Sequence, residues 1–181
     1  MAAFSKLYVA APAVFKPRDF FRVIMLGLGL VVFQSSVIAW AGISGYGPEW
    51  VWPLAVYVAL RSELWVAVLA AFLLGFFRDA VGGGFLGLHQ FTLALVIWLF
   101  HSFRPRLDFF APLTLMTLIL VLSLGGCLFV MTPIMAALGW PSDHFNPWPV
   151  FFFSSSSSAL VAPFLFRFLQ WLTREREKRH D

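Results

Sequence analysis

The feature that most constrains the fold of this chain is a series of long apolar runs separated by short breaks of glycine, proline or charge. The run from Phe20 to Trp40 is about 21 residues long, enough for a helix to cross a hydrocarbon layer of ~30 Å. Lys16, Pro17 and Arg18 precede this run, whereas a signal sequence places its charges first and a short apolar core after them. Only 12% of the residues are charged, against about 25% in a typical soluble domain. The chain is therefore predicted to be an integral membrane protein with a single domain.

The breaks between the runs predict an all-α fold of six transmembrane helices. The second of these helices is short, because about fourteen residues rise only ~21 Å along a helix. An alternative interpretation fuses residues 50–77 into one helix and leaves five spans. Pro133 is expected to bend the last turns of the fifth helix. The expected spans are 20–41, 47–60, 64–81, 85–101, 109–137 and 148–171, between a basic N-terminal tail (1–19) and a basic C-terminal tail (172–181).

The distribution of basic residues favours six spans over five. With six spans and a cytoplasmic N-terminus, every Lys and Arg except Arg78 lies on the cytoplasmic side, in agreement with the positive-inside rule. With five spans, Arg104, Arg106 and the basic C-terminal tail would lie on the outer side, and the bias would disappear. Both termini are therefore expected in the cytoplasm, and residues 139–147 are expected outside.

The sequence contains no recognisable catalytic or metal-binding motif. His89 and His101 are about 18 Å apart on the fourth predicted helix, too far to share a metal ion. A hydrolase triad of Asp143, His144 and a serine of the last helix would require the fold to bring these three residues together. This is the weakest interpretation. Cys127 has no partner for an intrachain disulfide and is expected to be buried. We therefore expect no enzymatic activity, no cofactor, no metal and no nucleic-acid partner.

Small residues form a ridge on the third predicted helix. Ala67, Ala71 and Gly75 recur every four residues and Asp79 ends the series, so all four lie on one face. Small side chains let another helix approach closely, whereas Arg78 points about 100° away. A carboxylate near a membrane span is costly unless it is paired. Asp79 is therefore expected either to cap the next helix, a role in which Asn serves about as well, or to bind a ligand or a partner.

Residues 71–88 resemble the signature of the rod shape-determining protein MreD family. The chain reads A-F-L-L-G-F-F-R-D-A-V-G-G-G-F-L-G-L, and the family pattern is G-F-x-x-G-x-x-x-D-x-x-S-G-x-x-L-G. Ala71 stands in place of the first glycine and Gly82 in place of the serine. The length, the six predicted spans, Pro163 in a serine-containing last span and the basic tail are also similar to this family. The residues that match, expected in packing or partner binding, are Phe72, Gly75, Asp79, Gly83, Leu86 and Gly87.

The resemblance implies a non-enzymatic subunit of the cell-elongation machinery in the bacterial inner membrane. The implied partners are the bitopic protein MreC and, indirectly, MreB filaments and RodA with its penicillin-binding transpeptidase. The family fold is considered similar to the substrate-binding subunits of ECF-type vitamin transporters, so such a subunit is the alternative function. The serines at 154–158 then either mark a close helix crossing or line a polar pocket. The candidate pocket residues are Gln34, Ser35, Ser36, His89, Gln90, Ser154 and Ser158.

Overall fold

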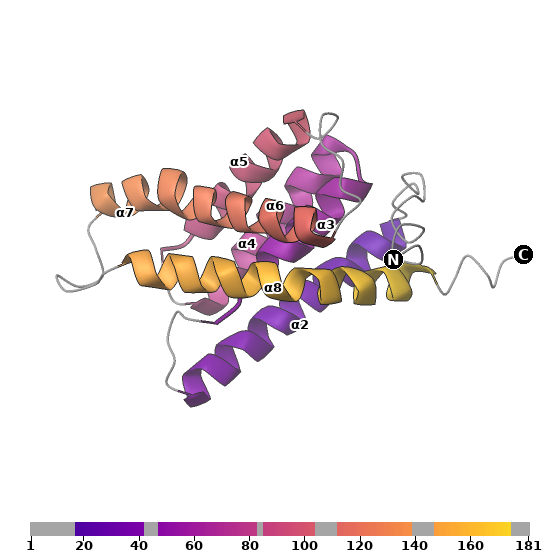
Figure 1. Ribbon diagram of the computed structural model, residues 1–181, viewed down its shortest axis with the longest axis horizontal. Coiled ribbons are helices and arrows are strands. Elements are labelled where there is room, and N and C mark those ends of the chain that lie inside the picture. The colour runs from indigo at the N-terminus through magenta and orange to yellow at the C-terminus, as the bar shows by residue number, and fades with distance from the viewer. Residues whose placement is uncertain (1–16, 42–46, 83–84, 104–111, 139–146, 175–181) are drawn as a thin grey trace, which may run out of the picture.

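The computed structural model shows a bundle of helices (Figure 1). It describes residues 17–41, 47–82, 85–103, 112–138 and 147–174. Strands are absent from these ranges, so the all-α prediction is confirmed for them. In chain order the elements are α2 (Pro17–Ala41), α3 (Val51–Arg61), α4 (Leu64–Gly82), α5 (Leu88–Phe103), α6 (Pro112–Gly126), the π-helical turn η2 (Cys127–Met131), α7 (Thr132–Leu138) and α8 (Pro147–Arg174).

Proline and glycine set several helix limits. α2, α6 and α8 each begin at a proline, the residue favoured in the first helical position because its missing N–H would have no partner there. α5 begins at Leu88 rather than at the predicted residue 85, because Gly87 adopts a φ of +96° and ends a turn. This left-handed conformation is open to glycine without strain. α3 also begins later than predicted, and residues 47–50 precede it.

α3 and α4 are separate helices. The chain leaves the helical conformation at Ser62, whose φ of −118° and ψ of 170° are extended. α4 then starts at Leu64 and packs back against α3. The fused helix over residues 50–77 is therefore wrong, and the five-span alternative loses its basis.

α3 lies at the centre of the bundle. Its residues 51–59 are all buried, and it packs against α2, α4, α5, α6 and α8. A helix that is apolar on every side and enclosed by other helices does not have to match the thickness of the bilayer. Burial within the protein therefore explains why α3 has only 11 residues, which extend ~16 Å.

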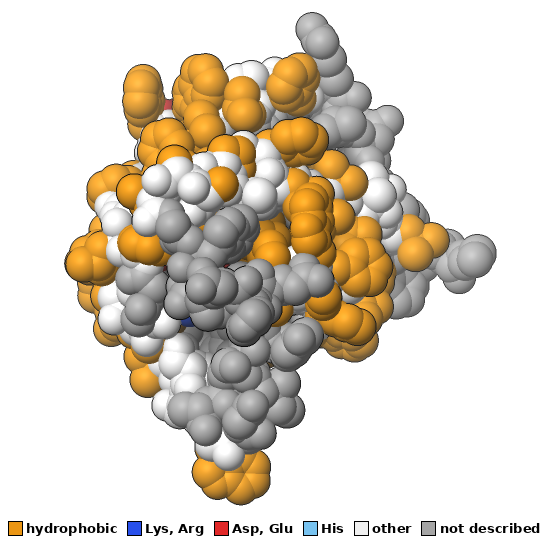
Figure 2. All heavy atoms as spheres, turned by 90° about the vertical axis from the view of Figure 1, so that its left-hand side faces the viewer, with side chains coloured by type: hydrophobic (Ala, Val, Ile, Leu, Met, Phe, Trp, Pro, Cys, Tyr) orange, Lys and Arg blue, Asp and Glu red, His pale blue; other side chains and the backbone are white. Residues whose placement is uncertain are grey.

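Within the described residues, four stretches are long and apolar enough to cross a membrane: Arg18–Val37, Leu64–Gly82, Leu113–Leu138 and Pro147–Leu172. α3 and α5 are apolar but shorter. Figure 2 shows many hydrophobic side chains on the described flanks of the molecule, as expected for a surface in contact with lipid. The chain is therefore a multi-pass membrane protein, while the number of six spans and the cytoplasmic termini stay predictions.

A π-helical turn interrupts the predicted fifth span just before Pro133. Proline has no N–H, and its ring would clash with the carbonyl four residues earlier, at Phe129, in a regular α-helix. In the wider turn, the N–H of Thr132 donates to the Cys127 carbonyl, and the Thr132 hydroxyl also donates to it at 2.9 Å. The predicted irregularity near Pro133 is thus present as a π turn. Cys127 is buried beside Met131, as expected.

Candidate functional site

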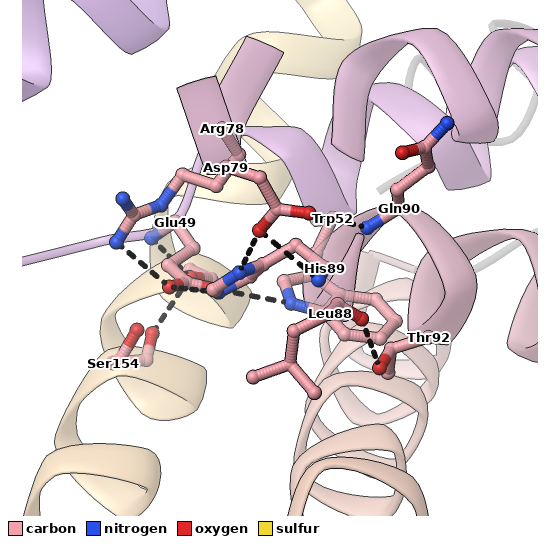
Figure 3. Close-up of polar contacts among 10 residues, drawn as sticks. Glu49, Trp52, Arg78, Asp79, Leu88, His89, Gln90, Thr92 and Ser154 are labelled. Atoms are coloured by element: carbon pink, nitrogen blue, oxygen red, sulfur yellow. Dashed lines mark hydrogen bonds and ion pairs between the residues drawn. The ribbon is translucent and has the colours of Figure 1, made fainter. Parts of the chain in front are cut away.

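The corner between α4 and α5 encloses the carboxylate of Asp79 (Figure 3). The Asp79 side chain is 1% exposed. Its Oδ2 accepts hydrogen bonds from the N–H groups of Gly87 at 2.9 Å and Gln90 at 3.2 Å, and its Oδ1 accepts one from the N–H of His89 at 3.1 Å. The N–H groups at a helix start have no partner within the helix, and the helix dipole favours a negative charge there. Asp79 therefore caps α5, one of the two roles predicted for it.

The small-residue ridge of α4 faces the interior. Ala67 and Ala71 have no exposed surface, and Gly75 is buried. A Cβ atom on Gly75 would collide with the Cα of Gln90 and would lie 2.6 Å from the Gln90 nitrogen and 2.8 Å from the His89 carbonyl oxygen. Glycine at position 75 therefore lets the α5 backbone approach α4 closely. This approach brings the N–H groups at the start of α5 within reach of Asp79, which lies one turn after Gly75 on α4.

Other residues of the family signature lie in different environments. Gly87 forms the turn before α5, as described above. Phe72 on α4 and Leu86 in the turn are 46% and 76% exposed, so neither packs in the interior. Gly83 lies outside the described residues. The signature thus has a buried part, which closes the α4–α5 corner, and two exposed residues, Phe72 and Leu86. We call the side of α4 that carries Phe72 the exposed motif face.

A second carboxylate, Glu49, lies beside this corner (Figure 3). His89 is placed between the two acids, with Nδ1 2.7 Å from Asp79 Oδ1 and Nε2 3.6 Å from Glu49 Oε1. Arg78 donates from Nη2 to Glu49 Oε1 at 3.3 Å, and Trp52 donates from Nε1 to Glu49 Oε2 at 3.1 Å. We call Glu49, Arg78, Asp79 and His89 the ionic cluster.

The ionic cluster is also connected to α8. The N–H of Glu49 donates to Ser158 Oγ at 2.7 Å, and the Ser158 hydroxyl donates to the Ser154 carbonyl at 2.6 Å. Ser158 is ~17 Å from the start of α8 at a rise of 1.5 Å per residue. The cluster therefore lies at the level of the middle of α8, inside the bundle, and joins the start of α3, the end of α4 and the start of α5 to this helix.

The contacts of Glu49 favour its ionised form. The Arg78 guanidinium and the Trp52 indole N–H both donate to its carboxylate oxygens, and hydrogen bonds to the charged form of an acid favour ionisation. Glu49 was not among the residues predicted from the sequence to belong to a site. The available signal was an acidic residue in the first turn of the second predicted span, on the same side of the membrane as Arg78, the one cation expected there.

The structure brings together part of the predicted polar pocket. His89 belongs to the ionic cluster, and Ser158 and Ser154 continue it into α8. Gln90 contributes its backbone N–H, while its side chain points away from the cluster (Figure 3). These four residues thus form a connection between helices.

The other candidate pocket residues lie on α2. Gln34 is 6% exposed, and its Oε1 has no hydrogen-bond partner among the described residues. Ser35 is half-buried. Ser36 is exposed and donates to the Val32 carbonyl at 2.9 Å, one turn earlier. Among the described contacts, none joins these three side chains to the ionic cluster.

The predicted separation of His89 from His101 is present in the structure. They lie at opposite ends of α5, and His101 Nε2 is 3.3 Å from the Ser62 carbonyl oxygen. Asp143 and His144, the other residues considered for chemistry, lie outside the described residues. In the part of the chain that is described, no group of three or more His, Cys, Asp or Glu side chains is arranged to hold a metal ion.

Comparison with known proteins shows a match to a family model. The family model described as rod shape-determining protein MreD matches residues 18–172. This range contains all four candidate spans and the whole ionic cluster. No curated protein and no solved structure matches the chain significantly.

Proposed function

The chain belongs to the MreD family of rod shape-determining proteins, and we propose on this basis that it is a non-enzymatic subunit of the inner-membrane complex that elongates rod-shaped cells. The family match over residues 18–172 is the observation that supports this function. A protein that is almost entirely helical and rich in exposed apolar side chains suits a role in holding partners within the membrane. Its contribution to peptidoglycan synthesis would then be made through those partners.

We propose that the direct partner is an MreC-like bitopic protein, whose transmembrane helix packs on the exposed motif face. MreB filaments and RodA with its transpeptidase would be reached indirectly. Phe72 continues a stripe of exposed apolar residues along one side of α4 at spacings of three and four, a pattern that suits helix-to-helix packing. Phe72 and Leu86 match the family signature without packing in the interior of this chain, which supports a role in contact with another chain. The stripe consists of Trp65, Leu69, Phe72 and Phe76.

The Asp79 carboxylate is not part of this proposed contact. Each of its oxygens already accepts from two donors, namely the N–H groups of Gly87, His89 and Gln90 and the His89 ring. A carboxylate offers about four acceptor positions, so these donors occupy them all. A partner would have to break the α5 cap in order to reach Asp79.

We propose the six-span topology with both termini in the cytoplasm. Reporter fusions at residue 143 and at residue 181 are expected to give opposite signals, periplasmic at 143 and cytoplasmic at 181, because the basic residues favour the cytoplasmic side. A fusion at residue 104 serves as the control and is expected to report the cytoplasm. A periplasmic signal at residue 181 would exclude the six-span arrangement.

Depletion of the protein in a rod-shaped host is expected to produce round, swollen cells, because the elongation complex would lose a subunit. Cell width and length measured by microscopy check this result, with expression of the wild-type chain from a plasmid as the control. The vitamin-transporter alternative predicts the opposite pattern, namely rod shape retained together with a new requirement for a vitamin. That pattern would reject the proposed function.

A further inference from the structure

We propose that His89 is a proton-binding site, and that its doubly protonated ring joins Asp79 to Glu49 and so fastens the start of α5 to the end of α4 and the start of α3. This inference goes beyond the proposed function and does not depend on it. It follows from the donors and acceptors around the two ring nitrogens (Figure 3).

The first ring nitrogen, Nδ1, must carry a hydrogen. It lies 2.7 Å from Asp79 Oδ1. Three backbone N–H groups donate to the Asp79 carboxylate, and hydrogen bonds of this kind favour the ionised acid. An ionised carboxylate only accepts hydrogen bonds, so the hydrogen in the short contact belongs to His89.

The second ring nitrogen, Nε2, faces another ionised acid. It lies 3.6 Å from Glu49 Oε1, which already accepts from Arg78, while Glu49 Oε2 accepts from Trp52. An unprotonated Nε2 would direct its lone pair at a negative oxygen and would repel it. With a hydrogen on Nε2, the same distance is an attractive ion pair.

The charge of the ionic cluster leads to the same protonation state. Glu49 and Asp79 carry two negative charges and Arg78 carries one positive charge, so a proton on His89 makes the sum zero. A neutral His89 would leave one unbalanced negative charge among side chains that are at most 19% exposed. Unbalanced charge inside a protein is costly.

Other elements that pack against α5 do not supply this missing charge. α6 contains no titratable side chain between Pro112 and Gly126, and η2 contributes the thiol of Cys127. α3 carries Tyr57 and Arg61, and the Arg61 guanidinium lies 4.9 Å from the centre of the Tyr57 ring near the far end of α3. The proton on His89 is therefore the charge that, together with Arg78, balances the two acids.

The protonation state can be measured by nitrogen NMR on the full chain in detergent micelles, with ¹⁵N-labelled histidine. We expect one histidine to show both ring nitrogens protonated at pH 7.5, and this signal to vanish in His89→Gln. If His89→Gln does not fold, the variants His101→Gln, His144→Gln and His180→Gln assign the signal by elimination. A neutral His89 ring at pH 7.5 would overturn the proposal.

A variant of the paired acid provides a second measurement. Glu49→Gln removes one negative charge, so Asp79 and Arg78 already balance and His89 should lose its second proton at a lower pH than in the wild type.

Because the proton stabilises the folded form, the unfolding midpoint of the wild type should fall by at least about 4 °C as the pH rises from neutral to strongly alkaline. The same fall in His89→Gln, or the same His89 titration in Glu49→Gln, would also overturn the proposal.

Discussion

A single methyl group added at Gly75 is expected to lower the free energy of unfolding by about 3 kcal/mol or more. The new Cβ atom would collide with backbone atoms of His89 and Gln90, and backbone atoms cannot rotate away as a flexible side chain can. Gly75→Ala would therefore push α5 away from α4, and the N–H groups of α5 would move away from Asp79. Thermal unfolding of the purified protein in detergent measures the loss, and the amount of protein in the membrane provides a second readout.

Two matched variants show whether this effect comes from the close approach. Gly29→Ala adds the same methyl group on α2, where the new Cβ meets no atom of another helix within 4 Å, and is expected to be neutral or to stabilise by up to about 1 kcal/mol. Leu74→Ala removes a fully buried side chain next to Gly75 and should cost about 2–5 kcal/mol through the cavity it leaves. Gly75→Leu should cost more than Leu74→Ala. Equal tolerance of Gly75→Ala and Gly29→Ala would show that α5 does not lie against Gly75.

Asp79→Asn is expected to destabilise the protein by about 2–4 kcal/mol, although Asn is normally as good a helix cap as Asp. Four donors converge on the two carboxylate oxygens. An amide has only one oxygen, so its NH₂ group would face at least one N–H donor and leave it without an acceptor. The substitution also removes the negative charge beside the start of α5 and beside His89. Thermal unfolding in detergent again provides the measurement.

Asp19→Asn is the control for a general effect of losing an acid. Asp19 lies in the first turn of α2, is more exposed than Asp79 and pairs with Arg22 at 3.6 Å. A partly exposed pair within one turn of a helix contributes less than about 1 kcal/mol. Similar losses in Asp19→Asn and Asp79→Asn would contradict the role assigned to the α5 cap.

The α4–α5 corner could be predicted from the sequence because its pattern is local. Ala67, Ala71, Gly75 and Asp79 are four residues apart, and this spacing alone places them on one face of a helix. The cap role followed from a carboxylate close to the next helix. The predicted cap nevertheless did not include every contact of Asp79. The fourth donor is the His89 ring, and residue spacing does not determine the direction of a side chain.

The Glu49 contacts could not be predicted in the same way. They join residues that are distant in the chain, namely Arg78, His89 and Ser158, and no periodic pattern relates these positions. Hydropathy likewise does not distinguish a helix surrounded by lipid from one surrounded by protein. For that reason the sequence predicted a short helix at α3 but not its position at the enclosed centre of the bundle.

The exposed motif face was also beyond sequence analysis. Phe72 and Leu86 belong to the same signature as the buried Gly75 and Asp79, and the signature does not say which residues point inward. The structure separates them by exposure. This separation identifies the specific surface that we propose for a partner.

Crosslinking in living cells tests most directly whether this surface contacts the MreC-like protein. A photoreactive amino acid is placed at position 72 on α4 and, as the matched control, at position 164 on α8. Phe164 is also exposed, but α8 packs against α6 and α3, away from the α4 stripe. We predict a crosslink to the MreC-like protein from position 72 and none from position 164. A crosslink from position 164 alone, or none from position 72 while both variants maintain rod shape, would contradict the proposed partner contact.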